Sequence, residues 1–387
     1  MIPYGRQKIT KADINSVVKV LNSDYITQGP TVPLFEAAVA RKVEAKYSIA
    51  VNSATSALHI SCLALGLGKG DYLWTSPNSF VASANCGLYC GASVDFVDIE
   101  LKDLNIDTLK LEAKLITAER KNTLPKVLVV VHFGGQPCDM KKIFSLAKRY
   151  NFKVIEDASH AIGSKYFGKY TGNCSYSDIT VFSFHPVKII TTGEGGMALT
   201  NDTNLADSIK LLRSHGITRD ATTMEEESHG DWYYEQLELG YNYRMTDIQA
   251  ALGLSQLKKL DKSIECRHDL VNRYCELLDG LPIIKISKTC NSYSSHHLYP
   301  VRLNTNKTKK SRFDVFHKLR KLGIGVNIHY IPIHTQPYFK KLGFKTGDYP
   351  EAEKYYSQAI SLPLFYGMSY KQQDYVIEKL SKVLSNK

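Results

Sequence analysis

The sequence predicts an α/β protein with a large domain on a mainly parallel mixed sheet and a smaller C-terminal α+β domain. Three observations support this fold class. Short apolar runs alternate with helical patterns over about the first 200 residues, which is typical of βαβ units. After about Arg244 the pattern changes to a long helix followed by a few shorter elements. The chain has 387 residues, of which 43% are hydrophobic and 22% charged, so it can fill two cores.

The first part of the chain supplies the elements of the sheet. Thr10 and Asp13 form a capping-box pattern ahead of a helix with apolar positions at i, i+3, i+4 and i+7. A strand is predicted at 47–52, followed by a nearly uncharged helix at 53–65 that Gly66 ends. Further buried strands are predicted at "DYLWTSP", "ASVDFVDI", "KVLVVVHF", "KVIEDAS", "ITVFSF" and "GMALTN". Helical patterns between several of these strands favour parallel pairing with helices on both faces.

The domain division is placed inside a long helix. A continuous helical pattern runs from Thr246 to Ile264, and we expect residues 1–255 to form the large domain and residues 256–387 the small one. The small domain should contain the strands "HHLYPVRL" and "GVNIHYIPI" and a final helix capped by Ser369.

The amino-acid composition excludes few classes of function. The net charge is +11, which suits nucleic acid, an acidic membrane surface or a phosphorylated small substrate equally well. No Lys/Arg run has the length of a nucleic-acid-binding arm, and the densest cluster, "NKTKKSR", is typical of a solvated loop. We therefore expect no nucleic-acid partner.

The cysteines and the N-terminus indicate a cytoplasmic, soluble protein. The eight cysteines show no CxxC or metal-ligand spacing, which favours reduced thiols and no metal site. The N-terminus lacks the charged and apolar regions of a signal peptide, and no window approaches the ~20 apolar residues of a membrane helix.

One lysine stands between two predicted buried strands. In "SFHPVKIITTGEGG", Lys188 precedes a Gly-Glu-Gly-Gly turn whose glycines allow close backbone approach. A surface lysine in a loop would give the same pattern. Lys188 gains significance only if the other groups of a pyridoxal phosphate (PLP) site occur in the chain. These are a carboxylate at the pyridine nitrogen, a phosphate cradle, a ring-stacking group and a group near the phenolic oxygen.

Candidates for each of these groups are present. Asp157 ends a buried strand, where low polarity would keep a pyridinium protonated, and His160 follows in "EDASHAIGS". A helix-capping aspartate and a core histidine are the alternatives. The N–H groups of the helix that begins at "NSATS" suit a phosphate, although an ordinary serine-capped helix has the same pattern. Ser183 lies five residues before Lys188, and Phe80 follows a strand end, where it could cover the ring or simply pack in the core.

The order of these candidates is more specific than any one of them. Each follows the carboxyl end of a predicted strand, and ligands bind at that edge of open α/β sheets. With these residues in place, the chain resembles fold-type I PLP enzymes of the nucleotide-sugar aminotransferase family. The similarity covers nearly the whole length, through "YITQGPTVPLFE", "NSATSALHISCLALGLGKGD", "VHFGGQPCDM", "EDASHAIGS", "FSFHPVKIITTGEGG", "RSHGITRD" and "GYNYRMTDIQAALGLSQLKKL". The segment "GIGVNIHYIPIHTQPYFKKLGFKTGDYPEAEKYYSQAISLPLF" is most similar to the pseudaminic-acid branch.

The resemblance implies a set of site residues. The cofactor-binding positions are Ala54, Thr55, Phe80, Asp157, His160, Ser183, Lys188 and Asn242. The substrate-contacting positions are Tyr4, Asp24, Tyr25, Ile26, Thr27, His185, Asn327, Ile328, His329 and Tyr330. Lys188 would carry PLP and act as the catalytic residue, and Asn242 would reach the phosphate in a neighbouring subunit, so that the active unit is a homodimer. The family often has Gly at the position of Ala54, and Ala also occurs in the pseudaminic branch.

The activity implied by the resemblance is ping-pong transfer of an amino group from L-glutamate to C4 of UDP-4-keto-6-deoxy-N-acetyl-L-altrosamine. Aminotransferases that make perosamine or aminoarabinose share the cofactor motifs and remain alternatives. A PLP-dependent sugar dehydratase has histidine in place of Lys188. A non-catalytic regulator would not need Lys188 or Asp157, and a dinucleotide oxidoreductase is disfavoured by the glycine spacing of "GLGKG". The sequence shows no clear arginine clamp for the amino donor, for which Arg219 and Arg244 are candidates.

Overall fold

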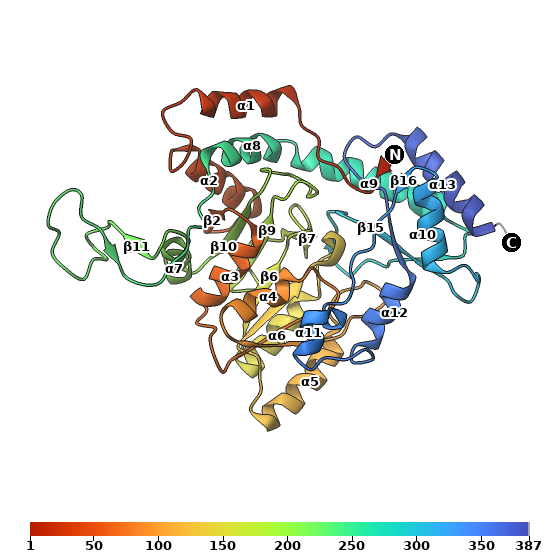
Figure 1. Cartoon of the computed structure of the whole chain (residues 1–387), viewed down its shortest axis with the longest axis horizontal. Helices are drawn as coiled ribbons and strands as arrows, with labels where there is room; N and C mark the ends of the chain where they lie inside the picture. Colours follow the sequence, from red (N-terminus) through yellow and green to blue (C-terminus); the bar gives the residue numbers. More distant parts are fainter. Residues whose placement is uncertain (386–387) are drawn as a thin grey trace.

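The computed structural model describes residues 1–385 and contains a seven-stranded sheet in the larger part of the molecule (Figure 1). The strand order is β2-β10-β9-β6-β5-β3-β4, and only β10 is antiparallel to its neighbours. The prediction of a mainly parallel, mixed sheet is confirmed. The strands are β2 (Tyr47–Val51), β3 (Tyr72–Thr75), β4 (Ser93–Phe96), β5 (Val127–Val131), β6 (Lys153–Asp157), β9 (Ile179–Ser183) and β10 (Gly196–Thr200).

Helices cover both faces of this sheet because its strands bury alternate side chains on opposite sides. In β5, Val127 and Val129 belong to the core cluster under α3, whereas Leu128 and Val130 pack on the side of α5 and α6. The covering helices are α2 (Thr31–Val43), α3 (Ala54–Ala64), α4 (Ala82–Tyr89), α5 (Thr108–Lys121), α6 (Met140–Tyr150), α7 (Thr203–Arg213) and α8 (Asp247–Leu257). A short 3-10 helix, η1 (Phe133–Gly135), follows β5.

The C-terminal part has its own antiparallel sheet and its own hydrophobic core. The sheet has the order β13-β15-β17, with α9, α10 and α13 packed against it. The bounds are α9 (Leu260–Leu277), β13 (Ile283–Lys285), β15 (Tyr299–Leu303), α10 (Arg312–Lys321), β17 (Ala359–Leu362) and α13 (Tyr370–Ser385). Ser369 caps α13 with Gln372 as predicted. The predicted small domain extends to residue 387, and residues 386 and 387 lie outside the described residues.

Short elements connect the two parts. Strand β1 (Ile2–Pro3) pairs in parallel with β16 (Ile324–Gly325), so the N-terminal segment lies against the C-terminal part. A three-stranded sheet joins β7 (Lys165–Tyr166) and β8 (Lys169–Tyr170) with β14 (Ser292–Tyr293). The remaining elements are α1 (Lys11–Leu21), β11 (Ile217–Thr218), β12 (Glu235–Gln236), η2 (Ile333–Thr335), α11 (Pro337–Lys341) and α12 (Pro350–Gln358). The β11–β12 arm projects away from the sheet at the left of Figure 1.

Two sequence predictions for the C-terminal half were wrong. The helical pattern from Thr246 to Ile264 forms two helices, because the chain leaves α-helical geometry at Lys259 before α9 begins. Of the segment "GVNIHYIPI", only its first residue, Gly325, belongs to a strand, β16. Beyond that point the segment forms an isolated β-bridge between Asn327 and Ser361 and then enters η2. Its side chains line the pocket described below, and its backbone does not pair as a continuous strand.

The N-terminal helix is anchored by a buried carboxylate and not by its apolar stripe. The predicted capping box of Thr10 and Asp13 is present. Asp13 also accepts hydrogen bonds from Ser255 Oγ (2.7 Å) and Lys259 Nζ (2.5 Å). Burial opposes ionisation, but these donors lower the pKa of Asp13 to about 2. Of its apolar side chains, Val20 is buried, but three of the predicted stripe are exposed: Ile14, Val18 and Leu21.

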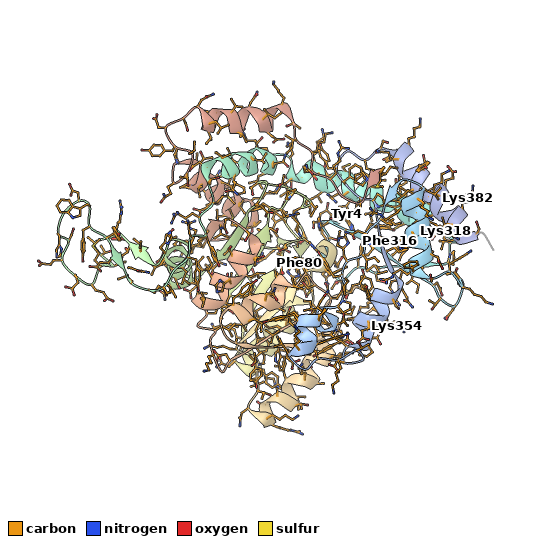
Figure 2. All side chains as sticks on the ribbon, viewed as in Figure 1. Tyr4, Phe80, Phe316, Lys318, Lys354 and Lys382 are labelled. Carbon is orange, nitrogen blue, oxygen red and sulfur yellow. The ribbon has the colours of Figure 1, made fainter. Side chains whose placement is uncertain are left out.

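Among residues 1–385, none of the helices combines the length and apolarity needed to cross a membrane. On the C-terminal part, Lys318, Lys354 and Lys382 are exposed on α10, α12 and α13 (Figure 2).

Candidate active site

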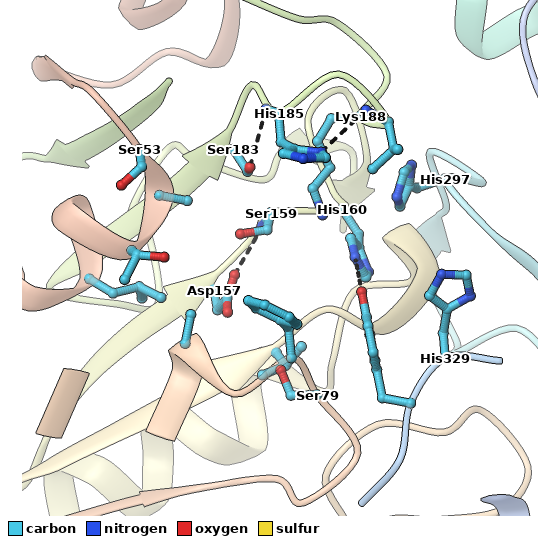
Figure 3. Close-up of a pocket in the computed structure, with 18 of the residues that line it drawn as sticks. Ser53, Ser79, Asp157, Ser159, His160, Ser183, His185, Lys188, His297 and His329 are labelled. Atoms are coloured by element: carbon cyan, nitrogen blue, oxygen red, sulfur yellow. Dashed lines mark hydrogen bonds between the residues drawn. The ribbon is translucent and has the colours of Figure 1, made fainter. Parts of the chain in front are cut away.

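A pocket lies at the carboxyl ends of the parallel strands, as expected for an open α/β sheet (Figure 3). Its volume is about 440 Å³, within the range of small-molecule sites. Asp157 ends β6 and Ser183 ends β9, while α3 starts directly after β2. Tyr4 and Phe80 (labelled in Figure 2) also line the pocket, so the N-terminal segment and the loop after β3 contribute to its walls.

Most of the residues singled out from the sequence line this one pocket: Tyr4, Ala54, Thr55, Phe80, Asp157, His160, Ser183, His185, Lys188, Asn327, Ile328, His329 and Tyr330. The structure does not bring the remaining ones there. Asp24, Tyr25, Ile26 and Thr27 lie on the exposed connection between α1 and α2. Asn242 is exposed beside β2, with its carbonyl near Asn52 Nδ2 (3.5 Å).

The Lys188 loop leaves the sheet after β9 and returns as β10, so the lysine stands above the edge where the pocket opens. The backbone N–H of Lys188 donates to His185 O (2.9 Å), and Thr192 N–H donates to Phe184 O (3.0 Å), which folds the loop back on the end of β9. Figure 3 shows the Lys188 side chain reaching into the pocket toward Asp157 and His160.

Gly196 explains why glycines follow the lysine. A Cβ atom at this position would lie 2.4 Å from Ala54 N and 2.5 Å from Ser53 C, closer than real Cβ contacts. The first residue of β10 therefore has to be glycine for the N-terminus of α3 to reach the pocket edge.

We expect Gly196→Ala to displace the start of α3, to destabilise the protein by about 1–3 kcal/mol and to weaken retention of a phosphate-bearing ligand. Thermal unfolding and ligand titration would measure both effects. The matched control is Gly68→Ala, because a Cβ at Gly68 meets nothing within 4 Å. Equal stability and affinity of the two variants would contradict this account of Gly196.

Asp157 is held rigidly at the floor of the pocket. Its Oδ2 accepts a hydrogen bond from Ser83 Oγ (2.6 Å), and its Oδ1 accepts one from the backbone N–H of Ser159 (3.2 Å). Ser83 is fully buried on α4 and also bonds Ser79 Oγ (2.7 Å). Both oxygens of the carboxylate are thus oriented by the protein, and the group has a fixed direction into the cavity.

His160 is held in one tautomer by its neighbours. The backbone N–H of Gly134 donates to His160 Nδ1 (3.2 Å), so the ring proton resides on Nε2, which lies 3.0 Å from Tyr330 Oη. Burial, followed by the nearby Lys188 amine, lowers the pKa of His160 well below its usual value. The neutral ring therefore donates to Tyr330, and the Tyr330 hydroxyl proton is free to point at a ligand.

The start of α3 provides an anion cradle. The backbone N–H groups of Ala54 and Thr55 find no acceptor within residues 1–385, since the Ser53 side chain caps Ser56 N (3.1 Å) instead. A phosphate would satisfy both groups and the positive end of the helix dipole. The N–H groups at the start of α3 suit the phosphate of PLP, the Asp157 carboxylate suits its pyridine nitrogen, and the Lys188 amine suits its aldehyde. The residues of the pocket therefore fit this cofactor.

The Lys188 amine is tuned toward its neutral form. Burial in the pocket lowers the pKa of Lys188 to about 8, although the charge of Asp157 partly opposes the shift. A lysine whose pKa is near 8 can act both as a nucleophile and as a base at neutral pH, where an ordinary lysine is almost fully protonated and does both poorly.

This pKa predicts how the apoprotein captures PLP. The folded value lies below the ordinary value of 10.5, so the amine loses its proton as the pH rises through about 8. The rate of covalent capture, followed by absorbance, should rise about tenfold per pH unit below pH 8 and level off above it. A rate that keeps rising to pH 10 would contradict the lowered pKa.

Some pocket residues were not found from the sequence. His297, 5% exposed, lies against His160 with ring centroids 4.5 Å apart and ring planes tilted by 38°, and its Nδ1 has no partner within the described chain. Burial lowers its pKa, so the ring is neutral. Ser53, Ser79 and Ser159 also line the pocket. The only signal for His297 was its place at the start of a predicted strand, whereas the serines resemble ordinary caps and turns.

Comparison with known proteins gives a consistent result over nearly the whole chain. A model of the DegT/DnrJ/EryC1/StrS aminotransferase family matches residues 7–381. The UDP-4-amino-4,6-dideoxy-N-acetyl-beta-L-altrosamine transaminase of Campylobacter jejuni is 40% identical and covers 99% of this chain and 98% of its own. The spore coat polysaccharide biosynthesis protein SpsC of Bacillus subtilis is 39% identical, with 99% and 97% coverage.

Solved structures agree. Helicobacter pylori PseC, an aminotransferase involved in the biosynthesis of pseudoaminic acid, superposes with a TM-score of 0.90 at 32% identity and 99% coverage of both chains. The sugar aminotransferase Spr1654 of Streptococcus pneumoniae in its PLP form has a TM-score of 0.87 at 31% identity, covering 99% of this chain and 98% of that one.

Proposed function

Because the chain belongs to the DegT/DnrJ/EryC1/StrS aminotransferase family, with PLP as its cofactor, we propose that it transfers the amino group of L-glutamate to C4 of a UDP-4-keto-6-deoxy-N-acetyl-hexosamine. The sugar we favour is the L-altro-configured one of pseudaminic acid biosynthesis. The observation that carries the proposal is the convergence of Lys188, Asp157 and the free N–H groups of α3 on one pocket.

Lys188 performs the proton transfers in this proposal. When bound, PLP holds the amino group between the two half-reactions and stabilises the charge that develops as a carbon loses its proton. The Lys188 amine takes the proton from Cα of glutamate in the first half-reaction. In the second it delivers a proton to C4 of the sugar, from the side of the pocket on which it lies, which fixes the configuration of the new amine.

The other pocket residues bind and orient. Asp157 would hold the pyridine nitrogen, the backbone N–H groups of Ala54 and Thr55 would bind the phosphate, and Ser183 would add its hydroxyl. Phe80 would cover the ring. The positions of these groups around the cavity and the chemistry of each donor or acceptor support these roles.

One wall is proposed to bind the sugar. Tyr4 from the N-terminal segment lies against His329, with ring centroids 5.2 Å apart, and His329 Nδ1 is bonded to Ser361 Oγ (2.8 Å). Burial raises the pKa of Tyr4, so its hydroxyl keeps its proton. Asn327 lies beside this pair, and together they offer neutral donors and acceptors to hydroxyl and acetamido groups. His185 and Ile328 line the same mouth.

The choice of sugar rests on two relatives: the Campylobacter protein, which is named an L-altrosamine transaminase, and the Helicobacter protein, which is described as involved in the biosynthesis of pseudoaminic acid. The Bacillus relative of similar identity is named a spore coat polysaccharide biosynthesis protein. Aminotransferases of the perosamine or aminoarabinose type are the alternative. The test is a panel of 4-keto sugars offered to the amino-loaded enzyme. The proposal predicts the highest kcat/KM for the UDP-linked L-altro sugar. Equal or better turnover of the D-gluco isomer, or of a GDP- or pentose-linked ketone, would overturn the substrate assignment.

We also propose a cytoplasmic homodimer. Asn242 and the segment Asp24–Thr27 lie outside the pocket of their own chain and are exposed. Tyr25 and Ile26 of this segment, and Leu21 just before it, are more than half exposed, which is an unusual number of large apolar side chains for one short stretch of free surface. A two-fold dimer would cover these side chains and bring Asn242 to the phosphate of the partner's site.

The dimer predicts complementation between two inactive variants. Lys188→Ala removes the lysine of its own site, and Asn242→Ala impairs the site of the partner. Random reassociation gives half mixed dimers, each with one intact site of two, so about a quarter of the wild-type activity should return. Asn306→Ala, which changes an exposed asparagine elsewhere, serves as the control. No recovery in verified mixed dimers would contradict a shared site.

A further inference from the structure

A second, smaller cavity lies on the other side of the Lys188 loop. It is enclosed by the N-terminal segment, the two residues that follow Lys188, the end of α8 and the first turns of α9. Its lining residues are Arg6, Gln7, Lys8, Ile189, Ile190, Gln256, Lys259, Ser263, Arg267 and Tyr366. The cavity therefore touches both the loop that carries the catalytic lysine and the segment that carries Tyr4.

The charge around this cavity is strongly positive. Arg6, Lys8, Lys259 and Arg267 all line it, and its lining contains no aspartate or glutamate. The carboxylate that faces this region is Asp13, which is bonded to Lys259 Nζ (2.5 Å) and compensates one of the four charges. Lys8 lies over the ring of Tyr366, 5.1 Å from its centroid, so its ammonium is held at the cavity by an aromatic face.

Two buried donors of the lining have no acceptor. Arg267 is 2% exposed and Ser263 is 3% exposed. Neither Arg267 Nε nor Ser263 Oγ has a hydrogen-bond partner within residues 1–385. Arg267 Nη1 donates to the carbonyls of His296, His297 and Leu364 (3.0–3.2 Å), but the guanidinium pairs with no carboxylate there. Buried donors of this kind are nearly always satisfied in folded proteins, so something outside the chain is expected to accept from them.

We propose that this cavity binds a single halide-sized anion, chloride in the cell, between Ser263 Oγ and Arg267 Nε. The space open to the centre of a water-sized particle is about 10 Å³, enough for one such particle and too small for a phosphate. A chloride ion accepts from both orphan donors and compensates the uncancelled positive charge, which a water molecule does not. The bound ion would fasten the N-terminal segment to α9 and support the Lys188 loop from behind through Ile189 and Ile190.

The first test is the unfolding temperature of the PLP-loaded enzyme, measured while sodium chloride replaces sodium gluconate at constant ionic strength. A bound ion stabilises only the folded state, so the unfolding temperature should rise by a few degrees and then saturate. The same curve in both salts would overturn the proposal.

Ser263→Ala gives a sharper contrast because it removes only the unpartnered hydroxyl. In gluconate the variant should be as stable as wild type or more so, since a buried orphan group is lost. In chloride it should be less stable, because the ion loses a donor. Lys8→Gln should reduce the chloride-dependent rise in the unfolding temperature. Lys262→Gln, which removes an exposed charge from α9 next to Ser263, should preserve that rise. A stability difference between Ser263→Ala and wild type that is identical in the two salts would mean that the cavity holds water.

Crystals grown or soaked in sodium bromide provide the direct observation. An anomalous peak between Ser263 and Arg267 is expected in the wild type, and its loss or marked weakening in Ser263→Ala. A bromide-free cavity in the wild type, at a concentration where surface bromide sites are occupied, would refute the site.

Discussion

Replacing Lys188 by alanine is expected to abolish amino transfer, with a loss of at least about 10⁴-fold, the upper range for removal of a general acid–base group. The variant also loses the covalent attachment of PLP. Lys188→Arg should be equally inactive, because a guanidinium keeps its charge and cannot donate an electron pair at neutral pH. Stopped-flow absorbance with saturating glutamate measures the first half-reaction.

A matched control is Lys169→Ala, which removes an exposed lysine from β8. It should retain wild-type rates. Amino transfer by Lys188→Ala within tenfold of wild type would show that another base moves the proton, and the role assigned to this residue would be wrong.

Asp157→Asn is expected to lower kcat by about 10²–10³-fold, because it removes a preorganised charge from the floor of the pocket. The asparagine has nearly the same shape, so the loss reports charge and not packing. Equilibrium dialysis of PLP and steady-state rates measure affinity and turnover separately.

Ser83→Ala is the companion variant for Asp157. It removes one of the two hydrogen bonds to the carboxylate and leaves the one from Ser159 N–H, so its effect should be much smaller than that of Asp157→Asn. If both substitutions change kcat equally, the charge of Asp157 is not what the reaction uses.

The sheet and the position of the site could be predicted because they depend on local patterns. The seven strands of the central sheet are short apolar runs, and in a mainly parallel sheet their carboxyl ends meet at one edge. Asp157, Ser183 and the start of α3 were therefore placed together by strand order alone. The sequence did not indicate how closely these groups approach one another, which the structure shows in contacts such as that of Gly196 with Ala54.

The remainder depends on tertiary contacts that have no local pattern. The break between α8 and α9 carries neither Gly nor Pro, and the apolar stripe of α1 would predict a buried face although Ile14 is 49% exposed. Ser83 is one of several small residues on α4, and nothing near it in sequence indicates that it bonds Asp157 across 74 positions. The cavity at Ser263 and Arg267 arises only when α9 meets the N-terminal segment.

The measurement that tests the central claim most directly is the absorbance spectrum of the PLP-loaded enzyme, recorded alone, after L-glutamate and after a UDP-4-keto-6-deoxy-N-acetylhexosamine. We predict that glutamate removes the visible-edge band of the lysine-bound cofactor and that the keto sugar restores it, with one amino sugar formed per site. A band that glutamate leaves unchanged, or a glutamate-treated enzyme that no keto sugar of the panel returns to its starting spectrum, would contradict the assignment of this pocket to nucleotide-sugar amino transfer.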